Sequence, residues 1–139
     1  MNLKFKKLSP EATLPKRANP TDAGLDLTAT TKSYDTPTGT YTYGTGLAVE
    51  IPENHVGLLF QRSSVYRTDM SLANAVGVID SSYRGELMLK FRAIGTNHYN
   101  VGERVGQLVI VPISLAEPVE VDDLDETSRG QGGFGSSDI

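Results

Sequence analysis

The chain has 139 residues, of which 38% are hydrophobic and 22% charged, and its formal net charge is −4. This length fits one domain with a sizeable core, and the absence of cysteine excludes disulfides, thiolate metal ligands and cysteine nucleophiles. The acidic balance argues against broad nucleic-acid binding, which depends on clustered Lys and Arg.

The first eight residues alternate apolar and basic side chains and lack the continuous apolar run of a signal peptide or a membrane span. We therefore expect a soluble protein that is cytoplasmic or otherwise intracellular and binds no membrane and no nucleic acid. The two histidines, His55 and His98, have no metal-ligand spacing. A cation held by oxygen ligands remains compatible with the composition.

Period-2 patterns predict short β-strands in the first half of the chain. Residues 3–8 give a weak strand signal, and residues 10–22 contain three prolines and are expected to form a loop. Residues 24–30 and 41–51 alternate and are rich in β-forming side chains, and residues 52–54 form a turn.

The second half continues in the same way. Residues 56–60 form a short apolar run, residues 87–94 alternate with polar side chains, and residues 105–113 are a candidate buried strand. One short helix is expected near residues 63–68, and no window holds a longer helical stripe. Many short strands between turns predict an all-β sandwich, barrel or jelly roll.

The composition changes at Asp122, where an acidic stretch leads into a glycine-rich tail with four glycines in residues 130–135. Such a segment has too few side chains to bury, so it should be mobile on its own. We expect a β-barrel core over residues 1–121 and a C-terminal arm over residues 122–139. No role can be assigned to residues 31–39 or 95–100.

Two segments offer hydrogen-bond donors of the kind that bind phosphate. Residues 62–64 (Arg-Ser-Ser) combine a guanidinium with two hydroxyls, although they also fit an exposed turn. The tail carries Arg129, Ser136 and Ser137, with a lone aromatic, Phe134, that would gain most by stacking on a planar base. The alternative for the tail is a disordered terminus.

Residues 77–85 are two apolar runs joined by a polar turn, which predicts a β-hairpin. Asp80 within it fits either a turn cap or a general base that takes a proton from water. Asp26 fits either a strand residue facing solvent or part of a metal site.

Five short motifs resemble, in their order, the five motifs of trimeric dUTP pyrophosphatases, and the resemblance spans almost the whole chain. They are residues 23–27 (Ala-Gly-Leu-Asp-Leu), 62–64 (Arg-Ser-Ser), 77–85 (Gly-Val-Ile-Asp-Ser-Ser-Tyr-Arg-Gly), 104–108 (Arg-Val-Gly-Gln-Leu) and 129–137 (Arg-Gly-Gln-Gly-Gly-Phe-Gly-Ser-Ser). The chain departs from the usual pattern at Leu25, where an aromatic is frequent, and at Gln61, where glycine or proline is common.

The resemblance implies a single jelly-roll-like, distorted β-barrel domain that forms a homotrimer, with each active site built from three chains. It implies Mg²⁺-dependent hydrolysis of dUTP to dUMP and pyrophosphate by attack of water at the α-phosphorus. This reaction would limit uracil incorporation into DNA and supply dUMP for thymidylate synthesis. The sequence does not show whether a regulatory protein binds this chain.

The resemblance also implies roles for individual residues. Asp80 matches the general base, Tyr83 matches the residue under the deoxyribose, and Asp26 matches the aspartate that supports the metal through water. The positions that match the family's uracil-binding residues, which recognise the base by hydrogen bonds, are Asn74, Gly77, Val78 and Ile79. The matches on the phosphate side are Arg62, Ser63, Ser64 and Gln107. The matches in the arm, which closes over a neighbouring site, are Arg129, Phe134, Gly135, Ser136 and Ser137.

Two rival functions share this scaffold. A dCTP deaminase resembles the family in fold but relies on a glutamate at the position of Lys90, and lysine cannot act as that proton shuttle. A nucleotide-binding or regulatory module would have no need of Asp80 together with the complete tail motif. The sequence therefore favours the pyrophosphatase.

Overall fold

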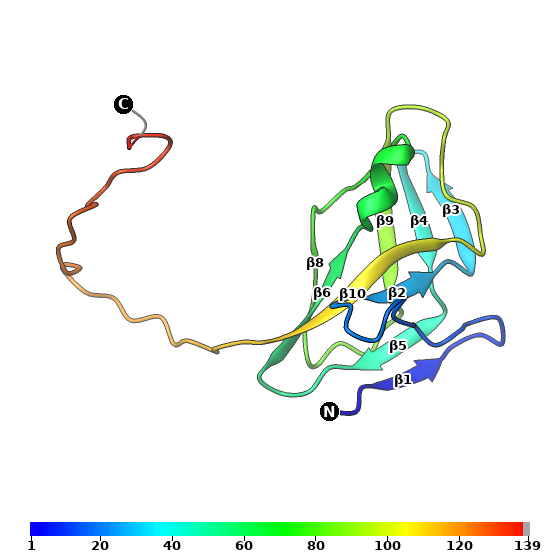
Figure 1. Ribbon diagram of the computed structural model, residues 1–139, viewed down its shortest axis with the longest axis horizontal. Helices are drawn as coiled ribbons and strands as arrows, with labels where there is room; N and C mark the ends of the chain where they lie inside the picture. The colour runs from blue at the N-terminus through cyan, green and yellow to red at the C-terminus, as the bar shows by residue number, and fades with distance from the viewer. Residues whose placement is uncertain (138–139) are drawn as a thin grey trace.

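The computed structural model describes residues 1–137, and its regular elements are all β-strands apart from one 3₁₀ helix (Figure 1). The predicted all-β fold is confirmed. No helix in that part of the chain is long and apolar enough to cross a membrane. In chain order the elements are β1 (Lys4–Lys7), β2 (Leu25–Thr28), β3 (Thr31–Asp35), β4 (Thr40–Gly44), β5 (Leu47–Glu50), β6 (His55–Phe60), the 3₁₀ helix η1 (Ser63–Arg67), β7 (Met70–Leu72), β8 (Gly77–Ile79), β9 (Met88–Ala93) and β10 (Arg104–Pro112).

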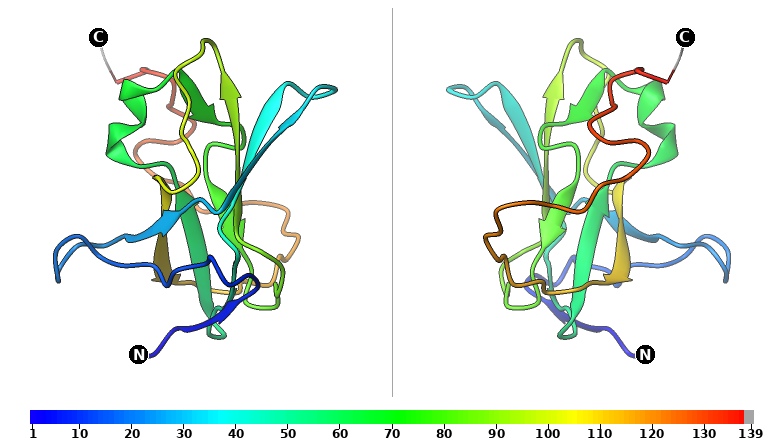
Figure 2. Two further views of the ribbon diagram at one scale, coloured as in Figure 1. Left: turned by 90° about the vertical axis from the view of Figure 1, so that its right-hand side faces the viewer. Right: turned by 90° about the vertical axis from the view of Figure 1, so that its left-hand side faces the viewer.

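The strands form three antiparallel sheets in a jelly-roll-like arrangement. Two four-stranded sheets have the orders β2-β10-β6-β8 and β3-β4-β9-β7, and β1 pairs with β5 in a third, two-stranded sheet. Figure 2 shows β10 and β6 on one side of the molecule and β9 on the other, with the β3–β4 hairpin projecting outward. The three sheets remain open, so the expected distorted barrel does not close.

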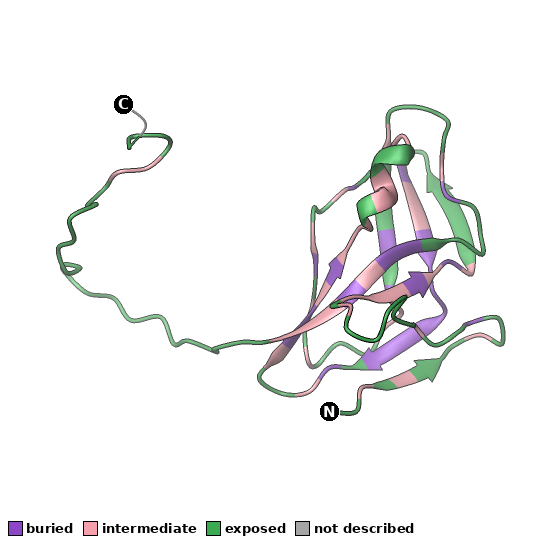
Figure 3. Ribbon diagram, in the orientation of Figure 1, coloured by how far each residue is buried: buried purple, intermediate pink, exposed green. Residues whose placement is uncertain are grey.

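The core lies between the two larger sheets and follows the period-2 pattern of their strands (Figure 3). Leu89 and Phe91 of β9 are fully buried, and Tyr43 of β4 packs edge-on against Phe91. Leu27 and Leu108 fill the core from the opposite sheet. Burying each such side chain stabilises the fold by about 1.5–3 kcal/mol. The alternate residues of β9 are left to face outward.

Two strands have no counterpart in the sequence prediction. β3 is exposed along its whole length and therefore has no apolar face to produce a pattern. β7 has only three residues, too few to show a period. The stretch predicted as one strand over residues 41–51 is divided into β4 and β5, and Gly46 adopts a left-handed backbone with a φ of 68° at the break.

The hairpin predicted for residues 77–85 is wrong. β8 pairs with β6 in one sheet, whereas β9 pairs with β4 and β7 in the other. The polar residues after Ile79 therefore cross from one sheet to the other. The local pattern resembled a hairpin because a strand lies on either side of the polar residues, β8 before them and β9 after them, but the two strands pair with other partners. This crossing leaves an opening between β8 and β9.

The C-terminal segment leaves the sheets after β10 and runs away from the core (Figure 1). Residues 113–137 carry no strand and are nearly all exposed. The last strand ends nine residues before the boundary predicted at 121, so the stretch 113–121 already lies outside the sheets. Residues 138–139 of the predicted arm lie outside the described residues.

Candidate active site

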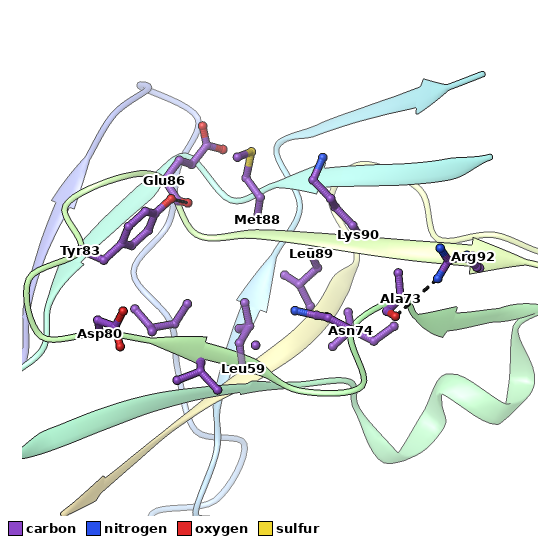
Figure 4. Close-up of a pocket in the computed structure, with 14 residues that line it drawn as sticks. Leu59, Ala73, Asn74, Asp80, Tyr83, Glu86, Met88, Leu89, Lys90 and Arg92 are labelled. Atoms are coloured by element: carbon purple, nitrogen blue, oxygen red, sulfur yellow. Dashed lines mark hydrogen bonds between the residues drawn. The ribbon is translucent and has the colours of Figure 1, made fainter. Parts of the chain in front are cut away.

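A cavity of about 440 Å³ opens between β8 and β9, where the two large sheets separate (Figure 4). It brings together the predicted base-side and sugar-side residues, namely Asn74, Gly77, Val78, Ile79, Asp80 and Tyr83. The sequence did not single out the remaining lining residues for the site, which are Leu59, Leu72, Ala73, Glu86, Met88, Leu89, Lys90 and Arg92. Their strands are distant in sequence and meet only through sheet pairing.

The floor of the cavity is apolar, with Leu59, Leu72 and Leu89 buried. Gly77 lies directly over Leu59, and a Cβ atom at Gly77 would stand 3.0 Å from the Leu59 Cβ. The absence of a side chain brings the β8 backbone close to the floor. The result is a slot with an apolar floor, bordered by the β8 backbone and by polar side chains such as Asn74 and Asp80.

Asn74 projects from a tight turn that links β7 to β8. The amide of Ala73 donates to the Lys90 carbonyl at 2.8 Å, and the amide of Val76 donates to the Asn74 carbonyl at 2.6 Å. Ala75 between them has a φ of 62°, an unfavourable value for a non-glycine residue. This turn places the exposed Asn74 carboxamide at the wall of the cavity, at the other end of β8 from Asp80 (Figure 4).

Asp80 and Tyr83 belong to one turn, which is closed by the Tyr83 amide donating to the Asp80 carbonyl at 3.1 Å. The Tyr83 hydroxyl donates to the Glu86 carbonyl at 2.9 Å. The ring folds over Gly85, where a Cβ atom would overlap it. The turn thus presents a carboxylate and an aromatic ring at the mouth of the same cavity, and both side chains are exposed.

The predicted phosphate-side residues gather around Asp26 on β2. One Asp26 oxygen lies 3.4 Å from the Arg62 Nε, and the other accepts from the Arg104 Nη1 at 3.0 Å. The Arg62 Nη1 also donates to the Ser64 hydroxyl at 3.4 Å. The Asp26 side chain is only 15% exposed, so this charge network is less screened than a surface pair.

Gln107 lies beside Asp26, because β10 and β2 pair these two residues. Its amide Nε2 donates to the Gln61 carbonyl at 3.2 Å. The Gln61 side chain in turn accepts from the Leu72 amide at 3.1 Å, at the start of the base-side cavity. Gln61, one of the departures from the motif, therefore joins the two predicted halves of the site.

A second, polar cavity of about 500 Å³ opens next to Arg62 and Ser64. Its other polar walls include Arg67, His98, Glu103 and Arg104, which the sequence analysis did not assign as site residues. Tyr99 closes its inner side, and burial raises the pKa of the Tyr99 phenol. This cavity shares no lining residue with the base-side cavity, so one chain holds the two halves of the predicted site in separate places.

The tail runs away from the strands (Figure 1), and none of its residues lines either cavity. Phe134 is fully exposed, and the Arg129 Nε donates only within the tail, to the Gly132 carbonyl at 2.9 Å. Gly135 has a φ of 84°, and Ser136 and Ser137 are exposed. The structure thus brings none of the predicted arm residues to a cavity of their own chain.

The described residues contain no group of three or more His, Asp or Glu side chains placed to hold a metal ion. Both oxygens of Asp26 face guanidinium groups, so a metal ion bound there would compete with Arg62 and Arg104 for the carboxylate. These residues therefore fit a cation that takes its ligands mainly from a bound phosphate chain.

Comparison with known proteins gives one consistent result. The dUTPase family matches residues 10–138. The deoxyuridine 5'-triphosphate nucleotidohydrolase of Rhodococcus erythropolis is 37% identical over 99% of this chain and 86% of its own length. The enzyme of the same name from Corynebacterium glutamicum is 40% identical over 97% of this chain and 93% of its own length.

Solved structures agree with these relatives. A mutant dUTPase of Staphylococcus bacteriophage 80alpha, determined with dUpNHpp, superposes with a TM-score of 0.82 at 30% identity and covers 99% of both chains. A mutant dUTPase of phage phi11, described with a structural Mg(II) ion, gives a TM-score of 0.76 at 31% identity and covers 88% of this chain and 98% of that one.

Proposed function

Because the chain belongs to the dUTPase family, it hydrolyses dUTP to dUMP and pyrophosphate, and we propose that Asp80 is the general base of this reaction in the cavity between β8 and β9. The observation that carries the proposal is that Asp80, Tyr83 and Asn74 line one cavity. A single nucleotide in this cavity would contact Asn74 through its base, Tyr83 through its sugar and Asp80 near its α-phosphate.

In this mechanism the exposed Asp80 carboxylate accepts a proton from water while the water oxygen attacks the α-phosphorus. The bond between the α-phosphorus and the bridging oxygen breaks, and pyrophosphate leaves with that oxygen. Asp80 then returns its proton to solvent. The exposure of Asp80 supports this role because the attacking water must reach it.

Uracil would lie in the apolar slot over Leu59, where the Asn74 carboxamide and the backbone of residues 77–79 offer hydrogen bonds to its edge. A base with the wrong polar edge would leave these groups unpaired, which costs affinity. Tyr83 would pack against the deoxyribose and leave no room for a 2′-hydroxyl. The ring is held for this role by its bond to the Glu86 carbonyl.

We further propose that the enzyme is a homotrimer, as the family pattern implies. In a single chain the base-side cavity and the Arg62 cavity have no lining residue in common. A neighbouring chain would supply Arg62, Ser63, Ser64 and Gln107 to the phosphates. The arm of a third chain would bring Phe134 onto the uracil and Arg129, Ser136 and Ser137 onto the γ-phosphate, excluding water as it closes.

Mg²⁺ belongs to the same proposal. When bound, it would neutralise charge that develops on the pyrophosphate leaving group. The triphosphate oxygens would hold it, with Asp26 reaching it through water, while Asp26 also orders Arg62 and Arg104. Because nucleoside triphosphates are intracellular metabolites, an intracellular site of action is part of the proposal.

The test compares the wild-type chain with Asp80→Asn, using chromatographic analysis of products from dUTP, dCTP, dTTP and UTP. The variant should bind a non-hydrolysable dUTP analogue normally and lose about 100- to 10,000-fold in kcat, the usual contribution of a general base. Glu53→Gln, which removes an exposed carboxylate from a distant turn, is the matched control. Full activity of Asp80→Asn would refute the assignment, and dUTP formed from dCTP would indicate a deaminase instead.

A further inference from the structure

The turn that carries Asp80 and Tyr83 is held by one guanidinium. Residues 80–87 lie between β8 and β9 and belong to no strand, and Leu87 at their end donates from its amide to the Leu47 carbonyl of β5 at 2.8 Å. The Arg84 Nη1 donates to the Ser81 carbonyl at 2.7 Å and to the Tyr83 carbonyl at 3.1 Å. A single side chain therefore links two backbone carbonyls of this turn.

The other edge of the same guanidinium faces β5. The Arg84 Nη2 lies 3.7 Å from one oxygen of Glu50, and the second Glu50 oxygen lies 2.9 Å from the Lys4 Nζ. The hydrogen bond and charge of Lys4 lower the pKa of the Glu50 carboxyl, which keeps it ionised. Lys4, Glu50 and Arg84 thus form a chain from β1 through β5 to the turn.

This chain of charges is exposed, with relative side-chain exposures of 77% for Lys4, 46% for Glu50 and 56% for Arg84. Exposed ion pairs contribute little to the stability of a fold. The value of this arrangement is geometric, because a planar guanidinium can bind two carbonyls and a carboxylate in fixed directions, which an ammonium group cannot reproduce.

We propose that Arg84 is a positioning residue, oriented by Glu50, that fixes the Asp80 carboxylate and the Tyr83 ring at the mouth of the base-side cavity. The inference rests on the proposed function of Asp80 and Tyr83. Without the clamp, the part of the turn from Asp80 to Tyr83 keeps the Tyr83 amide bond and the Tyr83 hydroxyl bond, both of which sit on the residue to be positioned. The remaining bonds of the segment lie at its far end, where Glu86 accepts from the Gly46 amide and Leu87 donates to the Leu47 carbonyl. A displacement of about 1 Å at a reacting group lowers a rate by about 100-fold.

The experiment measures kcat and KM for dUTP and UTP with wild type, Arg84→Met, Arg84→Lys and Glu50→Gln, together with the melting temperature of each. Arg84→Met should lower kcat for dUTP by about 10- to 100-fold and reduce the preference for dUTP over UTP. Arg84→Lys and Glu50→Gln should show smaller losses of the same kind. The melting temperatures should stay close to that of the wild type.

The matched control is Arg17→Met, because Arg17 also clamps a turn through a carbonyl, donating from its Nε to Asp22 at 2.8 Å, and does not line the base-side cavity. It should leave kcat and the dUTP preference unchanged. If wild type hydrolyses dUTP and Arg84→Met keeps both its kcat and its preference, the proposal is wrong. Equal losses for dUTP and UTP with a lowered melting temperature would also overturn it. A wild type without dUTP hydrolysis would instead reject the proposed function.

Discussion

Gly24 and Gln107 lie in such close contact that a Cβ atom at Gly24 would overlap the Gln107 side chain. Gly24 precedes β2, and Gln107 lies on β10, the strand that pairs with β2. The glycine of the first motif thus leaves room for the glutamine of the fourth. This contact gives a physical reason for a residue that carries no chemistry of its own.

Gly24→Ala should therefore push the Gln107 carboxamide away from the Gln61 carbonyl and weaken phosphate binding. Loss of that hydrogen bond would lower the free energy of unfolding by about 1 kcal/mol, and KM for dUTP should rise. Urea unfolding and steady-state kinetics measure the two effects. In a Gln107→Ala background the added methyl should cost much less. Equal costs in both backgrounds would show that the overlap is not the cause.

Tyr83→Ala should raise turnover of UTP relative to dUTP, because the surface that faces the sugar would be lost. Gly85→Ala should act in the same direction, since its methyl group would overlap the Tyr83 ring and displace it. The measurement is the ratio of kcat/KM for the two nucleotides. An unchanged ratio in both variants would place sugar discrimination elsewhere in the site.

The sequence predicted β9, whose side chains alternate between core and solvent, and β10, which is a mostly apolar run. It could not predict β3, whose residues are all exposed, nor the separation of β8 from β9. β3 forms a hairpin with the next strand, β4, whereas β8 pairs with β6 and β9 pairs with β4 and β7, strands that are not its neighbours in the chain. Local pattern carries no information on such partners.

The residues of the candidate site also fall into two groups, those predicted from a continuous motif and those that only the structure reveals. Asp80 and Tyr83 were identified because they lie in one continuous motif. Arg104 was not assigned a role, because its contact with Asp26 at 3.0 Å arises from the register of β10 against β2. Arg84 was identified only as part of its motif and was given no role. Its hydrogen bonds to two carbonyls depend on a turn conformation that the sequence does not predict.

Stability should fall at alkaline pH because of Tyr43. Burial raises the pKa of its phenol to about 12, and its hydroxyl donates to the Tyr99 carbonyl at 2.8 Å. The pKa in the unfolded chain is about 10, so this contribution is fully present below pH 10 and is lost as the pH rises towards 12. Urea unfolding from pH 8 to pH 12 measures it. Tyr43→Phe should be less stable at pH 8 but should lose less stability with rising pH, and parallel curves would contradict the prediction.

Truncation after Thr127 should leave the fold and the oligomer intact while activity falls severely. The last strand ends at Pro112, and the tail residues contact neither cavity of their own chain, so their removal exposes no core. The proposed stacking of Phe134 and the grip of Arg129 on the γ-phosphate would both be lost. Light scattering and thermal unfolding test the first part of the prediction, and steady-state kinetics with dUTP tests the second. Phe134→Ala in the full-length chain is the comparison variant, because it removes the ring and keeps Arg129. It should retain more activity than the truncated chain.

Full activity after truncation would mean that the arm does not close over a site. Loss of the fold after truncation would mean that the arm stabilises the core.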